Sequence, residues 1–557
     1  MSRTRRSRLV AAAVLAGYVL VAFGFLGLPL FVERGHRYVG FGYDPQIFIW
    51  AFAWWPHAIL HGVNPFVTHA VWAPDGLNLA WTTTVPGLAL VFWPLTAVAG
   101  PIVSYDVAAI LMPALAAWTA FLLCRRLVAS LWAAIAGGYL FGFSTYVLAQ
   151  GGEGHLHLSS VFLVPLAGLV VVRFLDGELT GRGLAIRLGP LLGFQVLTAT
   201  EVAFTVTLAL AAGLVLAYLF VPSRRSRVAA LLGPLLGAYA IGAALTAPFL
   251  YFLLTGFHKG GFNNQDTFVA DLANFVVPTK VTLIGGSWAK GLASRFPGNP
   301  SEQDAYLGVP TVLAVALFAR SRLRAPSGRL VLAAFVLAVV AALGARATIG
   351  GRSSVPLPWR LVHSLPLFDN VLTSRLAVYA ALAAALAVAL WAAARPGPLG
   401  WAVPVLCAVA LVPDPAAGGF ATGYDIAPFF TDAAYRACID PGENVLPLPV
   451  RGGAALLWQA ETGFRFTMTG GDISPTIPGD FQAAGFMDAV TDGTKAGPDD
   501  VANLRAFIAE KDVTSVIVDP TRAAFWIPAL DQIAKPHRVG GVVLYHLRRF
   551  PPPCPST

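Results

Sequence analysis

Residues 42–50 read Gly42-Tyr-Asp-Pro-Gln-Ile-Phe-Ile-Trp50 and combine an acidic residue, a proline and several aromatic side chains. An Asp directly before a Pro is typical of a helix start, with Asp as the N-cap and Pro in the first helical position. Trp and Tyr are enriched where a bilayer meets water. We therefore expect an interfacial helix that reaches about residue 60. Tryptophans of this region are expected to anchor it on the membrane: Trp50, Trp54, Trp55, Trp72 and Trp81.

The composition of the whole chain indicates a polytopic α-helical membrane protein. Of its 557 residues, 56% are hydrophobic and 12% are charged, whereas about 25% are charged in a soluble domain. Several apolar runs are long enough to cross a bilayer, which takes about 20 residues each. The net charge of +9 comes from short basic runs between these segments, so it indicates membrane topology rather than nucleic-acid binding.

Residues 1–415 can be threaded through the membrane in one consistent way if the basic loops lie on the cytoplasmic side. This threading has about eleven transmembrane helices, a cytoplasmic N-terminus and long outer loops at residues 32–103 and 254–308. The first span, residues 9–31, exceeds the roughly 7–15 apolar residues of a signal peptide core. Residues 85–99 are expected to dip into the membrane without crossing it, because a crossing there would invert every later basic loop.

Residues 416–557 predict a soluble extracytoplasmic α/β domain. Long apolar runs end near residue 413, and Asp, Gly and Pro become frequent. Residues 444–449, 513–519 and 539–547 are predicted strands, and residues 500–511 have the apolar spacing of a helix. Cys438 and Cys554 either form a disulfide, if this part faces an oxidising compartment, or remain free thiols.

Asp44 is the candidate general base. Its simplest interpretation is structural, because Asp before Pro is an ordinary helix start. The two roles are compatible, since a carboxylate fixed at a helix start near water is oriented for taking a proton from a hydroxyl within hydrogen-bond reach.

Glu153, His155 and His157 form a second candidate group in the loop after the third predicted helix. Alternate residues of an extended loop point the same way. One Glu and two His on one face could hold a divalent metal ion or bind a phosphate. A polar, solvent-exposed loop at the end of a helix explains these three residues equally well. The glycines of this loop, Gly151, Gly152 and Gly154, are expected to leave the backbone open to a ligand.

Four further polar residues are candidate substrate contacts. Glu201 lies either at membrane depth, where acidic residues mark functional sites, or in an outer loop. Lys259 and Glu302 lie on the second outer loop, where a cation could hold a lipid-linked phosphate. Arg375 starts a helix at the outer side against the positive-inside trend, so it needs an anionic partner. That partner is Asp369, a carboxylate of the site or a substrate phosphate.

Four segments in this order resemble the GT-C superfamily of membrane glycosyltransferases and, within it, bacterial membrane proteins related to the YfhO family. They are residues 42–46 with Trp50 and residues 64–66, residues 154–157, Glu302 with residues 306–308, and residues 365–368 with Arg375. The likeness covers residues 9–412 loosely.

The resemblance implies transfer of a sugar from a polyprenyl-phosphate donor to a glycan, lipid or protein acceptor of the cell envelope, on the outer face of the plasma membrane. It implies that Asp44 is the catalytic base. Substrate contacts are expected from the other candidates: Glu153, His155, His157, Glu201, Arg375, Lys259 and Glu302. Many GT-C members have two adjacent acidic residues in the first loop, whereas Asp44 stands alone. The cofactor is either a divalent metal ion, held by Glu153 and His155, or none.

Two other classes of protein fit the composition. A transporter or flippase of lipid-linked sugars would place polar residues at mid-membrane depth, whereas the polar residues here gather on one side. A non-catalytic membrane scaffold would leave Asp44, Glu153, Glu201 and Arg375 scattered in space. The positions of these four residues therefore distinguish a scaffold from an enzyme.

Overall fold

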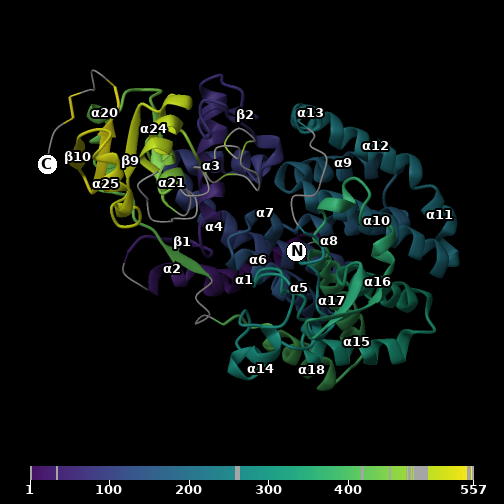
Figure 1. Cartoon of the computed structure of the whole chain (residues 1–557). Helices are drawn as coiled ribbons and strands as arrows, with labels where there is room; N and C mark the ends of the chain where they lie inside the picture. The colour runs from purple at the N-terminus through teal and green to yellow at the C-terminus, as the bar shows by residue number, and fades with distance from the viewer. Residues whose placement is uncertain are drawn as a thin grey trace.

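The computed structural model describes residues 3–32, 35–256, 264–414, 420–450, 453–471, 473, 478, 481, 500–548 and 553–554. Figure 1 shows a large helical region and, at one end of it, a sheet built from the C-terminal part of the chain. The helices of the helical region are α1 (Arg3–Ala22), α2 (Pro29–Val32), α3 (Asp44–Leu60), α4 (Pro86–Leu127), α5 (Leu131–Gly142), α6 (Thr145–Gly152), α7 (Leu156–Ser159), α8 (Leu163–Leu175), α9 (Gly181–Thr198), α10 (Thr200–Phe220), α11 (Arg225–Ala229), α12 (Leu232–Leu245), α13 (Ala247–Thr255), α14 (Gly286–Ala293), α15 (Val309–Arg322), α16 (Pro326–Ala342), α17 (Ala377–Ala393) and α18 (Leu399–Val409).

Small residues allow the central helices α4, α5 and α17 to pack closely. A Cβ added at Gly142 of α5 would lie 2.2 Å from the backbone nitrogen of Ala117 in α4. A Cβ added at Gly137 would lie 2.6 Å from Cys124 Sγ and 3.0 Å from the Cβ of Ala389 in α17. Close approach at small residues is how helices associate in membranes, because the lipid competes equally for larger apolar side chains.

Among the described residues, six helices are long and apolar enough to cross a membrane, or seven if one pair bent by 46° is a single span. The six are Arg5–Gly27, Pro86–Leu127, Leu131–Gly152, Leu156–Leu175, Thr200–Phe220 and Thr373–Ala393. Several other helices that the sequence predicted to span, such as α15, α16 and α18, are shorter than this limit. The structure supports a helical membrane protein, and the count of eleven spans stays a prediction.

The apolar segment at residues 85–99 continues into the next helix in the structure. Together they form α4, which breaks at Gly100, where φ is 84° and ψ is 167°. A residue with this backbone conformation interrupts the helical hydrogen bonds, so the first part of α4 can take a direction of its own.

The C-terminal part contains a five-stranded mixed sheet with the strand order β10-β11-β9-β7-β8. The strands are β7 (Asn444–Leu448), β8 (Thr467–Met468), β9 (Ser515–Val518), β10 (Pro536–Val539) and β11 (Val542–His546). β7 runs parallel to β8 and β9, and the other pairs are antiparallel. The helices of this part are α19 (Pro428–Thr431), α20 (Tyr435–Cys438), α21 (Ala455–Glu461), α24 (Asp500–Glu510) and α25 (Ile527–Leu530). The predicted strands and the predicted helix at residues 500–511 are found at these places. Cys438 and Cys554 form a disulfide.

The C-terminal part is joined to the first loop by main-chain pairing. β1 (Arg37–Val39) and β6 (Ala421–Gly423) form a two-stranded antiparallel sheet. β2 (Val67–Thr68) and β3 (Leu77–Asn78) form a small hairpin in the first loop. In the turn between β2 and β3, the Ala70 carbonyl accepts a hydrogen bond from the backbone N–H of Met468 at 2.8 Å. Lys511 also pairs with Asp75 at 2.9 Å.

Three tryptophans of the first loop, Trp50, Trp54 and Trp72, take part in this contact. Trp50, Trp54, Trp55 and Trp72 are at most 5% exposed. The Trp50 and Trp54 rings pack edge-on against Phe464 of the C-terminal part, with centroids 5.5 and 5.2 Å apart. The prediction that these four side chains anchor the loop in the membrane is therefore wrong, because their rings are already covered by protein.

Gln459 of α21 holds three segments together from a fully buried position. Its Oε1 accepts from Trp50 Nε1 at 2.6 Å, and its Nε2 donates to the carbonyls of Ala70 and Phe466 at 2.7 and 2.9 Å. Gln459→Met would keep the volume and leave these three groups without the side-chain amide. A buried polar group without a partner costs about 1–3 kcal/mol.

We expect Gln459→Met to lower the free energy of unfolding by roughly 2 kcal/mol or more, because Trp50 Nε1 and the Phe466 carbonyl lose their partner while the Ala70 carbonyl keeps the Met468 N–H. Thermal unfolding of the purified protein in detergent measures this. The matched control is Gln532→Met, because Gln532 is an exposed glutamine of the same region. Equal stability of the two variants would show that the Gln459 contacts contribute nothing.

Candidate functional site

α3 presents Asp44 at its very start. Asp44 is the first helical residue and Tyr43 takes the N-cap position, with no side-chain capping hydrogen bond. The prediction that Asp44 caps the helix is therefore wrong by one residue. Pro45 is tolerated at the second position because the first N–H groups of a helix have no intrahelical acceptor. The Asp44 carboxylate is thus left to interact outside its own helix.

α4 fixes the segment that leads to Asp44. The Tyr105 hydroxyl donates to the Val39 carbonyl at 2.9 Å, and Asp106 Oδ1 accepts from the Val39 N–H at 2.8 Å. Two residues later, the Phe41 N–H donates to the Gly152 carbonyl at the end of α6, at 2.7 Å. Both polar groups of a strand residue and the following turn are therefore tied to neighbouring helices.

Gly40, Gly154 and Pro45 make a contact that only glycine permits. A Cβ on Gly154 would lie 2.5 Å from Pro45 Cγ, and a Cβ on Gly40 would lie 2.7 Å from Gly154 Cα. Both glycines also have positive φ, +100° at Gly40 and +80° at Gly154, which L side chains disfavour. The prediction that Gly154 leaves its backbone open to a ligand is wrong, because Pro45 fills that space. Gly154 instead brings the start of α3 against the loop that carries His155.

His155 contacts Asp44 directly. Its Nε2 lies 2.9 Å from Asp44 Oδ2, and the Asp44 side chain remains 54% exposed. Glu153 lies in the same loop, where burial raises the pKa of its carboxyl group and the nearby His155 and Lys280 oppose that rise. The predicted base and two predicted substrate contacts therefore meet, and the base is accessible from water.

Arg375 joins two other predicted residues. Its Nε and Nη2 donate to Glu302 Oε1 at 3.0 and 2.7 Å, and its Nη1 donates to Glu201. The Ser374 hydroxyl donates to the second oxygen of Glu302 at 2.8 Å. Burial opposes ionisation of Glu302, but the charge and hydrogen bonds of Arg375 hold the pKa of this carboxyl group below its ordinary value.

These contacts decide between the partners considered for Arg375. Its anionic partners are carboxylates of the site, Glu201 and Glu302, and not Asp369. Glu201 lies in the first turn of α10, inside a candidate membrane span, rather than in an outer loop. A buried charge of this kind is stable only when it is paired, so the guanidinium holds together α10, the turn that precedes α17 and the residue 301–308 segment.

Gln150 and Asp304 connect the two groups, and the sequence did not single them out. Gln150 is buried at the end of α6 and contacts His155, the Ser301 carbonyl and Asp304. Burial, and after it the charge of Glu302, raise the pKa of Asp304 well above its ordinary value. Burial therefore favours the neutral form of Asp304. A buried Gln in an apolar helix next to a Gly-rich loop was the available sequence signal.

His157 does not share a face with Glu153 and His155. The predicted extended loop is instead the end of α6, a short turn and α7, so alternate residues do not point the same way. His157 stacks on Phe48 of α3, with ring centroids 5.6 Å apart. Its Nδ1 is buried and has no hydrogen-bond partner within the described part of the chain. His157 therefore packs behind the Asp44–His155 pair.

The second long loop, residues 254–308, brings to the site a lysine that the sequence did not single out. Lys259 lies outside the described residues, so its role stays a prediction. Lys280 is exposed and close enough to Glu153 to affect its pKa. It was missed because an isolated Lys in a loop is most often a solvated charge.

A metal ion remains a prediction for Glu153 and His155. Within the described ranges, no three His, Cys, Asp or Glu side chains are arranged as a metal site. The chemistry considered below uses side chains only.

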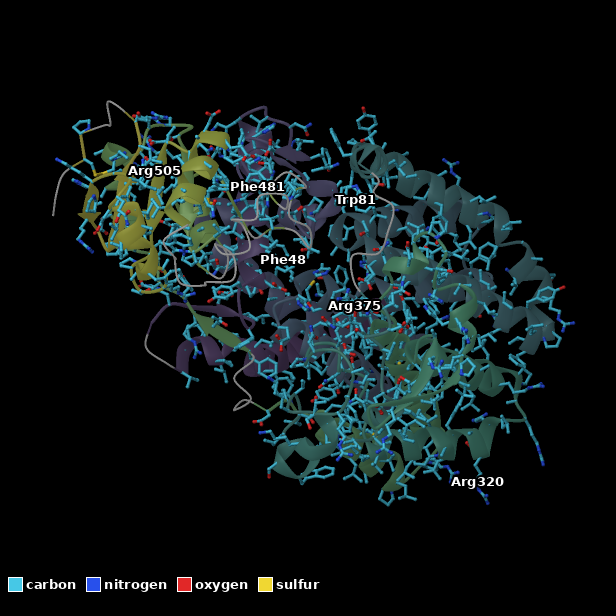
Figure 2. The ribbon with its side chains drawn as sticks, in the orientation of Figure 1. Phe48, Trp81, Arg320, Arg375, Phe481 and Arg505 are labelled. Carbon is cyan, nitrogen blue, oxygen red and sulfur yellow. A yellow bond between two sulfur atoms is a disulfide. The ribbon has the colours of Figure 1, made fainter. Side chains whose placement is uncertain are left out.

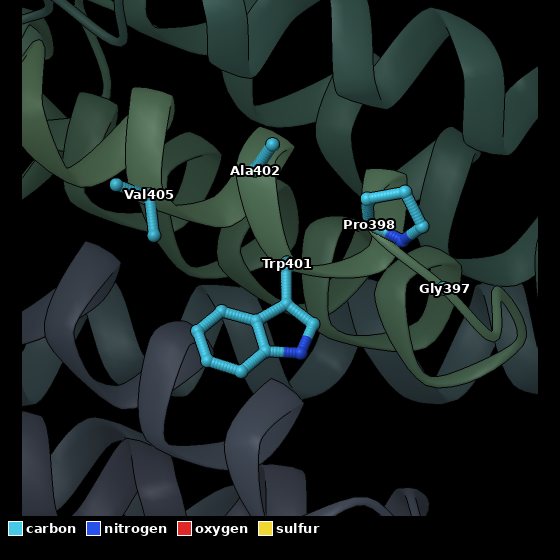
Figure 3. A pocket seen from close by; sticks show the side chains of 5 residues that line it. All are labelled: Gly397, Pro398, Trp401, Ala402 and Val405. Carbon is cyan, nitrogen blue, oxygen red and sulfur yellow. The ribbon is translucent and has the colours of Figure 1, made fainter.

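Two views place the site within the molecule. Figure 2 shows Arg505 of the C-terminal part and Arg320 of α15 at opposite ends, with Phe48 and Arg375 between them. Figure 3 shows an open apolar pocket lined by Gly397, Pro398, Trp401, Ala402 and Val405. None of the candidate site residues lines that pocket, so it is separate from the site.

A family model described as "Domain of unknown function (DUF6311)" matches residues 13–412. The chain belongs to the DUF6311 family. A comparison with curated proteins finds no match. The family model covers the helical region with all of the candidate residues, including Asp44 and Arg375. The narrower likeness to YfhO proteins is not part of it and stays a prediction.

Solved structures show that this DUF6311 protein has the GT-C fold. It is similar to the oligosaccharyltransferase of Archaeoglobus fulgidus in complex with Zn and sulfate, with a TM-score of 0.53, 12% identity, and 96% of this chain and 73% of that chain covered. A structure of oligosaccharyltransferase AglB from Archaeoglobus fulgidus with an inhibitory peptide and a dolichol-phosphate gives a TM-score of 0.52, 12% identity, and coverage of 98% and 75%. For arabinofuranosyltransferase AftD from Mycobacteria the TM-score is 0.61 and the identity 16%, with 99% of this chain and 40% of that chain covered. The DUF6311 chain thus spans about two-fifths of AftD.

Proposed function

We propose that this DUF6311 protein is an integral membrane glycosyltransferase, which moves a sugar from a polyprenyl-phosphate donor to a cell-envelope acceptor on the outer face of the bacterial plasma membrane. The observation that carries the proposal is the contact of 2.9 Å between Asp44 and His155, beside Glu153 and open to water. It occurs within a fold that is similar to those of an oligosaccharyltransferase and an arabinofuranosyltransferase.

The chemistry assigned to Asp44 is proton acceptance. The acceptor hydroxyl oxygen forms a bond to the anomeric carbon of the sugar, and the bond from that carbon to the donor phosphate oxygen breaks. The bonding electrons leave with the polyprenyl phosphate, and the hydroxyl proton passes to the Asp44 carboxylate. A base of this kind must lie within hydrogen-bond reach of the hydroxyl, which the exposed position of Asp44 allows.

A cation near the leaving phosphate would stabilise its growing charge. Lys280 is the described residue that fits, because it is exposed and close to Glu153. Arg375 fits less well, since both of its ion partners are protein carboxylates. We therefore assign phosphate contact to Lys280, with Lys259 as a second candidate, and a supporting role to Arg375, Glu201 and Glu302.

Two observations support the outer face as the location. The disulfide between Cys438 and Cys554 is typical of an oxidising compartment. Arg320, in the basic last turn of α15, lies at the opposite end of the molecule from Arg505, as cytoplasmic and outer ends would. Residues 416–557, proposed as an extracytoplasmic α/β domain, contact the loop that carries Asp44, so they are suited to binding the acceptor.

The polyprenyl-phosphate donor is supported by the fold likeness to AglB, which was solved with a dolichol-phosphate. A non-catalytic scaffold would leave the candidate residues scattered. Asp44 instead contacts His155, and Arg375 contacts Glu302 and Glu201. This convergence favours an enzyme.

An in vitro transfer assay tests the proposal. The purified protein in liposomes is supplied with a panel of polyprenyl-phosphate sugars and an envelope extract as acceptor, with and without a chelator. The expected result is release of polyprenyl phosphate together with a glycosylated acceptor, for at least one donor. Movement of intact donor across the bilayer without release of polyprenyl phosphate would instead identify a transporter.

A further inference from the structure

Two neighbours hold the side-chain amide of Gln150 in one orientation by accepting hydrogen bonds from its nitrogen. Its Nε2 donates to the Ser301 carbonyl at 3.0 Å and to Asp304 Oδ2 at 3.1 Å. A carbonyl oxygen is an acceptor only, so the side-chain nitrogen of Gln150 must face it. The amide oxygen therefore points the other way, toward His155 Nδ1 at 2.7 Å.

This orientation determines which ring nitrogen of His155 carries a proton. An amide oxygen accepts hydrogen bonds and cannot donate them. The short contact to His155 Nδ1 is therefore a hydrogen bond only if Nδ1 is protonated. The contact with Gln150 thus fixes the proton on Nδ1, whereas Nε2 faces the carboxylate of Asp44. The backbone reinforces the arrangement, because the His155 N–H donates to the Gln150 carbonyl at 2.8 Å.

The same contact fixes the direction of the ring. With Nδ1 bound to Gln150, Nε2 is directed at Asp44 Oδ2. Rotation of the imidazole by half a turn would break both contacts. Gln150 is fully buried and Asp304 is 2% exposed, so water does not compete for these hydrogen bonds. A carboxylate oxygen only accepts hydrogen bonds, so the ring holds Asp44 in one place when Nε2 also carries a proton and donates to Oδ2.

We propose that Gln150, itself held by Ser301 and Asp304, is a positioning residue that fixes the Nδ1–H form and the ring direction of His155 and, through His155, the placement of Asp44. The consequence for sugar transfer rests on the function proposed above. The consequence for the His155 ring does not, so the two can be tested separately.

The state of the ring can be measured by nitrogen NMR of the full-length protein labelled with ¹⁵N-histidine in lipid bilayers. The His155 signals are assigned as those lost in His155→Gln. We expect a protonated Nδ1 in the wild type and in Gln150→Glu, whose carboxyl oxygen also accepts. In Gln150→Met we expect the Nδ1 signal to shift. A wild-type Nδ1 without a proton, or an Nδ1 signal unchanged in Gln150→Met, would overturn the proposal.

Kinetics separate a positioning role from a general loss of structure. At metal-binding histidines, loss of the outer hydrogen-bond partner lowers activity by roughly 10–100-fold. We expect a factor of the same order here, so Gln150→Met should lower kcat by that factor and change KM little. In the Asp44→Asn background, the same substitution should have no further effect, because it acts through His155 on Asp44. Additive losses would contradict this path.

Gln303→Met is the matched control, because Gln303 lies on the same segment as Ser301 and donates to the Phe296 carbonyl instead. It should change neither the NMR signals nor kcat. If no donor gives transfer with the wild type while the NMR results hold, the proposed function fails and the positioning of His155 stands.

Discussion

Asp44→Asn is expected to lower the rate of sugar transfer by roughly 10²–10⁴-fold, the usual contribution of a general base. Asn has nearly the shape of Asp but cannot accept the proton of the acceptor hydroxyl. The side chain is 54% exposed and its ion-pair partner is His155, so folding should change little. Surface substitutions usually alter stability by about 0.5 kcal/mol or less. The rate is measured as polyprenyl phosphate released per unit of purified protein.

Asp75→Asn is the control for this prediction. Asp75 is another carboxylate of the first loop, but it pairs with Lys511 rather than with His155. Its substitution should leave the transfer rate within a few-fold of the wild type. Transfer by Asp44→Asn at more than a tenth of the wild-type rate would contradict the role of Asp44 as base.

Gly154→Ala is expected to abolish most transfer although residue 154 has no chemistry of its own. The added Cβ would lie 2.5 Å from Pro45 Cγ and 2.7 Å from Pro45 Cδ, at a residue with φ of +80°. The strained backbone alone costs about 1–2 kcal/mol. The overlap must push the start of α3 away from the loop of His155. A displacement of about 1 Å can lower a rate by roughly 100-fold, and we expect a loss of at least that size.

Two variants show whether the overlap is the cause. Gly151→Ala is the matched control, because its Cβ would meet only the Cβ of Ser159 at 3.9 Å, and transfer should be retained. Pro45→Ala removes the ring atoms that the Cβ added by Gly154→Ala would strike. The double variant should therefore recover part of the transfer rate, and the backbone strain should limit the recovery. No difference between Gly154→Ala and Gly151→Ala would show that the close contact is unimportant.

Local signals singled out several residues that the fold brings into contact, such as Asp44 with His155 and Arg375 with Glu201. Asp44 could be found from sequence because Asp, Pro and aromatic residues coincide at a helix start. Arg375 could be found because a cation at the outer end of an apolar helix needs a partner. The partner itself could not be found, because Glu201 and Glu302 are 174 and 73 residues away.

The errors arose where one local pattern has two physical causes. Buried tryptophans such as Trp50 and lipid-facing tryptophans look alike in a sequence, and only the docked C-terminal part shows that protein covers them. The glycines near His155 show the same ambiguity. Open space at Gly151 and a tight contact at Gly154 cannot be told apart before the position of Pro45 is known.

By itself, the sequence determined a helical membrane protein with its candidate base on the first long loop. Apolar run length and a helix-start signal depend only on neighbouring residues, so they can be read directly. The tertiary structure decided which side chain meets that base. The contact of His155 with Asp44 bridges 111 residues. It depends on Gly154 fitting against Pro45 and on Gln150 turning the imidazole, which are packing and hydrogen-bond constraints between segments that the chain order does not bring together.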